Sequence, residues 1–126
     1  LAKAASGNLM EEAELVGDIK VLVAKVEAAS ADVLRDLTTS TRDSLGPSVV
    51  MLVADTGGKL NFVACASPEA IKLGVHSGNV VKTAATAAGG GGGGRPDMAQ
   101  AGGKDPSKID ESIQAAKTML RASLEA

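Results

Sequence analysis

The chain has 126 residues, 44% of them hydrophobic and 22% charged, with a formal net charge of −2, which is the composition of one soluble globular domain. One Phe and no Trp or Tyr argue against aromatic cages and aromatic base-stacking platforms, and the single residues Cys65 and His76 exclude an internal disulfide and any multi-cysteine or multi-histidine metal site. No apolar run is as long as a membrane span and no signal-peptide pattern opens the chain, so we expect a cytoplasmic protein with no membrane partner.

The N-terminal segment predicts a helix followed by a strand. Residues 1–15 place apolar side chains at helical spacing between glutamates, and Gly17-Asp18 would end that helix. Because the chain starts at Leu1 rather than Met, we interpret residues 1–16 as the end of a helical linker in a longer protein and residues 17–126 as the globular domain. The β-branched segment Ile19–Val26 then predicts a strand.

The next segments predict a helix and a hairpin. Ser30 can cap a helix that runs to Leu45 and ends at Gly46-Pro47. The apolar run Val49–Ala54 predicts a buried central strand, and the turn at 55–58 joins it to a strand at Leu60–Ala66. The predicted apolar face of the helix contains Val33, Leu34, Leu37, Thr41 and Leu45.

The second half of the chain predicts three more helical segments and one short strand or buried loop. A helical turn is expected over 67–73, a helix capped by Ser77-Gly78-Asn79 and ending at Ala88, a strand or loop at Met98–Ala101, and a last helix at Lys108–Leu124. The sum is a mixed α+β (α/β) domain, with a small central sheet and flanking helices. The core stripe of the last helix is Ile109, Ile113, Ala116, Leu120 and Leu124.

The most unusual segment is GGGGGGRPDMAQAGG at residues 89–103. A glycine run usually indicates a flexible linker, but a linker is not normally followed by such a specific sequence. We therefore favour a backbone surface that a partner can approach closely, with exposed N–H groups able to face a phosphate. The run lacks the residues of a P-loop, and we expect no cofactor and no metal in this domain.

Several polar residues in and after the run are candidates for binding. Arg95 could meet a phosphate or a base edge, or it could pair with Asp97 and fix the loop. Gln100 could read a base edge, or it could satisfy backbone groups beside the glycines. Residues 1–58 carry 5 basic and 9 acidic residues, whereas residues 59–126 carry 8 basic and 6 acidic ones, so positive charge is concentrated in the half that contains the run.

Catalytic residues are not expected in this chain. Cys65 lies in the apolar segment VACA, which is typical of a small buried hydrophobic residue. His76 stands just before a predicted helix start, which favours a surface or capping role over that of a base. Carboxylate pairs such as Asp110 and Glu111 are interpreted as solvated charge on helix surfaces.

The segment at 89–103 followed by KDPSKID resembles the C-terminal domain of bacterial alanyl-tRNA synthetases, often called C-Ala, which belongs to the DHH-associated superfamily. VVMLVADTGGKLNFVACAS, HSGNVVKTAATAAGG and LRDLTTSTRDSLG are similar to the same domain, so the resemblance covers roughly Val16 to Leu124. It implies a mixed α/β domain that binds the elbow of tRNA-Ala, with residues 1–16 as the end of a helical linker from the editing domain. It also implies that the domain bridges the aminoacylation and editing modules of an ATP-dependent alanine–tRNA ligase, with ATP, Mg and Zn bound in other domains.

The family motif names Gly90 to Gly94, Arg95 and Lys104 as candidates for contacting tRNA, and two alternatives stay open. Related DHH phosphoesterases usually have His after the glycines, where this chain has Arg95, and they carry an Asp-His-His segment that this chain lacks. The other alternative is a dimerisation or protein-interaction module that uses the Ala-rich helix Val80–Ala88, and a homodimer is possible in either case. The tRNA-binding candidates are Gly90, Gly91, Gly92, Gly93, Gly94, Arg95, Gln100, Lys104 and Lys108.

Overall fold

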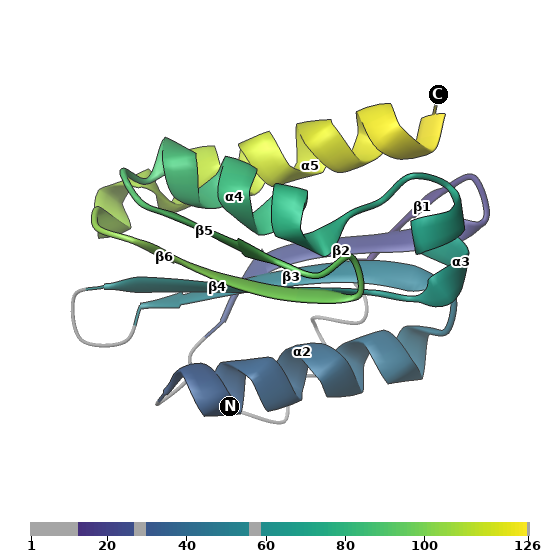
Figure 1. The fold of residues 1–126 in the computed structure, drawn as a ribbon, viewed down its shortest axis with the longest axis horizontal. Coiled ribbons are helices and arrows are strands. Elements are labelled where there is room, and N and C mark those ends of the chain that lie inside the picture. Colours follow the sequence, from purple (N-terminus) through teal and green to yellow (C-terminus); the bar gives the residue numbers. More distant parts are fainter. Residues whose placement is uncertain (1–12, 27–29, 56–58, 126) are drawn as a thin grey trace.

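The computed structural model describes residues 13–26, 30–55 and 59–125, which form one six-stranded sheet with helices on both faces (Figure 1). The strand order is β1-β2-β3-β4-β6-β5, in which β2 and β3 are parallel and all other neighbours are antiparallel. The strands are β1 Glu14–Val16, β2 Ile19–Lys25, β3 Ser48–Asp55, β4 Leu60–Ala66, β5 Gly91–Gly94 and β6 Met98–Gly103. The mixed α/β fold class is therefore confirmed.

Three longer helices cover the two faces of the sheet, and a short helix lies between β4 and α4 in the chain. Helix α2 (Ala31–Leu45) lies on one face, and α4 (Ser77–Ala87) and α5 (Ile109–Glu125) lie together on the other, as Figure 1 shows below and above the sheet. Helix α3 (Pro68–Lys72) follows β4, and the 3₁₀ turn η1 (Pro106–Lys108) leads into α5. The parallel connection from β2 through α2 to β3 is the βαβ unit that such a pairing requires.

Each face of the sheet has its own apolar core. The strands alternate in side-chain direction, so Val49, Met51 and Val53 of β3 face α4 and α5, whereas Val50 and Leu52 face α2. The core under α4 and α5 also contains Val80, Val81, Ala84, Ala85 and Ala88 of the Ala-rich helix. That apolar face is buried inside the domain, so it is not available as the dimer contact that the alternative interpretation expected.

The N-terminal prediction was wrong at its end. Glu14 and Leu15, expected in a helix, form with Val16 the edge strand β1, which pairs with β2 across the turn at Gly17-Asp18. A 2.6 Å ion pair between Arg121 Nη2 and Glu14 Oε2 ties this strand to α5, and the hydrogen bond from the guanidinium lowers the pKa of Glu14. Residues 1–12 lie outside the described residues, so the linker and the domain boundary stay predictions.

Helix α2 confirms the predicted cap but not the whole predicted face. The Ser30 hydroxyl accepts a hydrogen bond from the Val33 amide at 3.3 Å, and Gly46, with φ of 78°, ends the helix. Val33 was predicted in the core and is 48% exposed, because the helix turns Thr38 toward the sheet instead. Thr38 can be buried since its hydroxyl donates to the Leu34 carbonyl at 2.7 Å.

Helix α4 begins at Ser77, and its N-cap is His76 rather than the predicted Ser77-Gly78-Asn79 segment. The His76 Nδ1 accepts a hydrogen bond from the Asn79 amide at 3.3 Å. The capping role considered for His76 in the sequence is therefore confirmed. The other predicted strands and helices of the described residues are present with boundaries that differ by a few residues.

Candidate nucleic-acid interface

The glycine run forms the edge strand β5, and we call the hairpin of β5 and β6 the glycine ribbon (Gly91–Gly94 and Met98–Gly103). Its strands pair from Gly91 opposite Gly102 to Gly94 opposite Ala99, and the Arg95 amide donates to the Met98 carbonyl at 3.0 Å to close the turn. All four residues of β5 are exposed. The glycine run is thus part of the sheet, and its lack of side chains leaves the main chain open to a partner.

Close packing explains why part of the ribbon must be glycine. A Cβ on Gly94 would lie 2.8 Å from the Ala99 Cα, and a Cβ on Gly92 would lie 2.5 Å from the Ala101 Cα. From the other side, a Cβ on Gly78 of α4 would lie 2.7 Å from the Gly94 carbonyl oxygen. Gly92 and Gly94 are thus required by the pairing of β5 with β6, whereas Gly78 lets helix α4 lie close against β5.

The charged candidates lie at opposite ends of the glycine ribbon. Arg95 occupies the turn, and Lys104 follows the last residue of β6, roughly 20 Å away at about 3.4 Å per strand residue. Arg95 Nε lies 3.8 Å from Asp97 Oδ1 with both side chains mostly exposed, so this ion pair is weak and can be exchanged for a phosphate. Lys108 in η1 pairs with Glu111 at 3.5 Å, which reduces its contribution of positive charge. Gln100 is exposed midway along β6.

Two residues beside the ribbon were not among the candidates. Asn61 of β4 pairs with Gly102, and Lys59 directly precedes Leu60, which pairs with Gly103 at the same end as Lys104. Lys59 is exposed, so that end of the ribbon carries two nearby ammonium groups. No local sequence signal could have joined these residues to the run, because the β4–β6 pairing links segments about forty residues apart.

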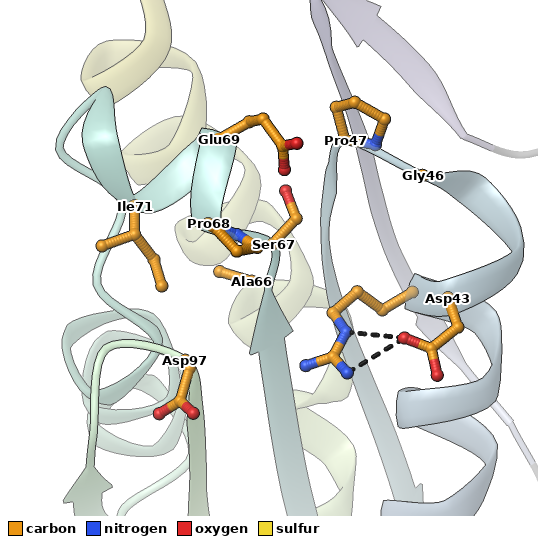
Figure 2. A pocket seen from close by; sticks show the side chains of 10 residues that line it. Asp43, Gly46, Pro47, Ala66, Ser67, Pro68, Glu69, Ile71 and Asp97 are labelled. Carbon is orange, nitrogen blue, oxygen red and sulfur yellow. Dashed lines mark hydrogen bonds and ion pairs between the residues drawn. The ribbon is translucent and has the colours of Figure 1, made fainter.

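A pocket of about 420 Å³ opens beside the ribbon turn, between the end of α2 and the start of α3 (Figure 2). Its charged lining residues are Arg42, Asp43, Glu69 and Asp97. Arg42 donates to Asp43 Oδ1 through Nε at 3.2 Å and Nη2 at 3.0 Å. Three carboxylates line this pocket with one guanidinium that is already paired, so the pocket is less suited to a phosphate than the cations at the ends of the ribbon.

The structure does not bring the single Cys and the single His together. Cys65 is fully buried under α2, whereas His76 starts α4 on the opposite face of the sheet. The hydroxyl of Ser67, which lines the pocket, accepts hydrogen bonds from two backbone amides. Within the described ranges, no group of three His, Cys, Asp or Glu side chains is arranged as metal ligands. Among those residues no helix has both the length and the apolar character needed to cross a membrane.

Cys65 should be inert toward thiol reagents in the folded protein. Burial raises the pKa of its thiol, and its Sγ lies 3.7 Å from the Thr39 hydroxyl. Labelling then requires unfolding, so we expect the native rate with a disulfide reagent to be at least about 10³-fold below the rate in denaturant. Similar rates in the two states would contradict the buried position.

Comparison with known proteins agrees with this fold and this motif. A family model described as the DHHA1 domain matches residues 18–122. The chain is 46% identical over 120 residues to an alanine–tRNA ligase of Alkaliphilus oremlandii and 40% identical over 124 residues to one of Bacillus pumilus. These matches cover 95% and 98% of this chain but only 14% of each relative, so the chain spans about one seventh of their length.

Two solved structures are similar to this domain. The C-Ala domain from Aquifex aeolicus alanyl-tRNA synthetase matches with a TM-score of 0.74 and 34% identity, over 90% of this chain and 98% of that chain. An exopolyphosphatase-related protein from Bacteroides fragilis matches with a TM-score of 0.55 and 8% identity, over 98% of this chain and 36% of that one, which concerns the fold alone.

The sheet, its helices and the glycine ribbon together define a DHH-associated domain. The family model matches residues 18–122 of this chain and 98% of the Aquifex domain is covered, so the resemblance drawn from the motif at 89–103 is confirmed. The chain belongs to the DHHA1 family and, within it, to the C-Ala domains of alanyl-tRNA synthetases.

Proposed function

We propose that this domain binds tRNA-Ala at its elbow for an alanine–tRNA ligase, and that it bridges the aminoacylation and editing modules of that enzyme. The names of the relatives support a role in charging tRNA with alanine, and the ligase chemistry would belong to the parts of those proteins that this chain does not cover. The observation that carries the proposal is an exposed strand of glycines with cations at both of its ends, in a C-Ala fold.

The ribbon offers two features that an RNA surface needs. Its glycines let the partner reach the main chain without displacing side chains, and Arg95, Lys59 and Lys104 can face phosphates on either side. The net charge of −2 and the absence of exposed aromatic rings predict modest affinity for the isolated domain. In the whole enzyme the domain is tethered, and a tether raises the effective concentration of a weak site.

The proposal can be tested by titrating the chain with tRNA-Ala and with a minihelix that lacks the elbow, at two salt concentrations. We expect tighter binding to the complete tRNA and weaker binding as salt rises, because phosphate contacts release counterions. Equal affinity for the two RNAs would show that the elbow is not recognised. No binding to either RNA at low salt would contradict the proposed function itself.

Arg95→Ala should lower the affinity for tRNA-Ala by about three- to tenfold at low salt. The slope of log affinity against log salt concentration should fall in magnitude by about one, as expected for the loss of one phosphate contact. The Arg95 side chain is 77% exposed beside the carboxylate of Asp97, so its loss removes a phosphate contact without disturbing the core. Lys20→Ala removes an exposed cation on β2, next to the opposite edge of the sheet, and is the matched control that should leave both quantities unchanged. If Arg95→Ala behaves like this control, Arg95 does not contact the RNA.

A further inference from the structure

The two faces of the glycine ribbon have different surroundings, and glycine has a different role on each. Residues that pair directly across two strands project to the same face, so Gly91 and Gly93 share a face with Gly102 and Gln100. The alternate residues of β6, Ala99 and Ala101, project to the other face, which packs into the core under α4 and α5. We call the first face, formed by Gly91, Gly93, Gln100 and Gly102, the smooth face.

The fold does not need glycine on the smooth face. A Cβ built on Gly91 or Gly93 has no atom within 4 Å, and one on Gly102 would meet its nearest neighbour, the Leu60 carbonyl oxygen, at an ordinary contact distance of 3.6 Å. None of the three has a positive φ. By contrast, a Cβ on Gly92 or Gly94 would collide with the backbone of β6.

Glycine at these three positions therefore weakens the sheet without serving its packing. A strand interior favours β-branched and aromatic residues, and glycine there provides no cross-strand side-chain contact. All four residues of the smooth face are exposed. A Cβ fits at all three of the glycines, so the packing of the fold does not explain why glycine occupies them.

We propose that the smooth face receives the flat face of a nucleobase or base pair of the bound RNA, an inference that rests on the proposed function. The backbone N–H and C=O groups of paired strands lie in the plane of the sheet, so this face presents flat peptide groups and no row of donors for a phosphate. The cations at the ribbon ends, Arg95, Lys59 and Lys104, would take the flanking phosphates. The side chain of Gln100 remains available at the margin for a base edge.

The smooth face could bind a base in place of the aromatic rings that other proteins use for stacking. Proteins that hold exposed bases usually stack them on aromatic rings, but this chain has no Trp or Tyr, and its one Phe, Phe62, is fully buried. Without side chains on the smooth face, a planar ring can reach van der Waals distance from the peptide groups. The proposal thus assigns contact to Gly91, Gly93 and Gly102, and it assigns a packing role to Gly90, Gly92 and Gly94.

The test is Gly93→Val, which adds a β-branched side chain to the smooth face. We expect an unfolding midpoint equal to or above that of the unmodified chain, about tenfold weaker binding of tRNA-Ala, and an unchanged salt slope. Gly91→Ala is a second, smaller variant with the same expected direction. Ala122→Val, on the exposed surface of α5, is the control for added apolar bulk and should bind like the unmodified chain.

The outcomes separate this inference from the proposed function. If the unmodified chain binds tRNA-Ala and folded Gly93→Val and Gly91→Ala bind equally well, the smooth face is not the contact surface, while tRNA binding stands. A loss of affinity accompanied by the reduced salt slope of Arg95→Ala would indicate a phosphate on this face and overturn the base assignment. If the unmodified chain binds no tRNA at low salt, the proposed function fails first.

Discussion

Gly90→Ala is expected to destabilise the domain by about 3 kcal/mol and to lower its unfolding midpoint by roughly 10–15 °C. A Cβ at position 90 would overlap the Gly102 carbonyl oxygen and lie 2.7 Å from the Gly103 Cα. The Gly90 amide also donates to the Ala85 carbonyl at 2.7 Å, so the backbone is held from both sides and cannot move away. Urea and thermal unfolding followed by circular dichroism would measure the change.

Gly91→Ala is the matched control, because the same methyl group one residue later meets open space. Its stability should equal or slightly exceed that of the unmodified chain, since alanine restricts the unfolded state more than glycine does. Equal stability of Gly90→Ala and Gly91→Ala would mean that β5 is not held against β6 as the structure has it, and that the run behaves as the linker considered from the sequence.

Phe62→Ala should have the larger effect, a loss of about 4 kcal/mol. Phe62 is the only aromatic residue, is fully buried in the core under α4 and α5, and has its Cε2 3.1 Å from where a Cβ on Gly103 would lie. Its removal would leave a cavity beneath β6, the strand that supports the glycine ribbon. Because domains of this size are stable by only about 5–15 kcal/mol, the variant would retain a small margin of stability.

Phe62→Leu provides the comparison for this prediction. It keeps an apolar side chain of similar volume and should destabilise by less than about 1.5 kcal/mol. Denaturant midpoints of the two variants, with the slopes checked for constancy, would separate cavity formation from other effects. A Phe62→Ala midpoint no lower than that of Phe62→Leu would contradict the close packing of this ring.

The core elements could be predicted because their sequences carry strong periodic signals. The continuous apolar run of β3, the capping Ser30 of α2 and the stripe of α5 each indicate one type of element. The strands at the sheet edges could not be assigned in the same way. Glu14–Val16 is too short to distinguish a helix from a strand, and only its pairing with β2 decides between them. Gly91–Gly94 has no side chains and hence no periodicity.

The candidate site was predictable as a segment but not as a surface. The motif at 89–103 names the glycines, Arg95 and Lys104 from the sequence alone. It does not show that Arg95 and Lys104 lie at opposite ends of a ribbon, or that alternate glycines face different surroundings. Both properties depend on the β4–β6–β5 pairing, which is a long-range contact that local patterns do not encode.

The strand order sets the distance between the first described strand, β1, and the glycine ribbon. The chain enters the sheet at β1, the edge opposite to β5, and five strand spacings of about 4.8 Å place these two edges roughly 24 Å apart. Strand β1 is held at this edge by its pairing with β2, and the ion pair between Glu14 and Arg121 also links it to α5. If RNA binds at the glycine ribbon as proposed, it therefore lies at the edge of the sheet opposite to the strand at which the described chain begins, and the width of the sheet separates the two.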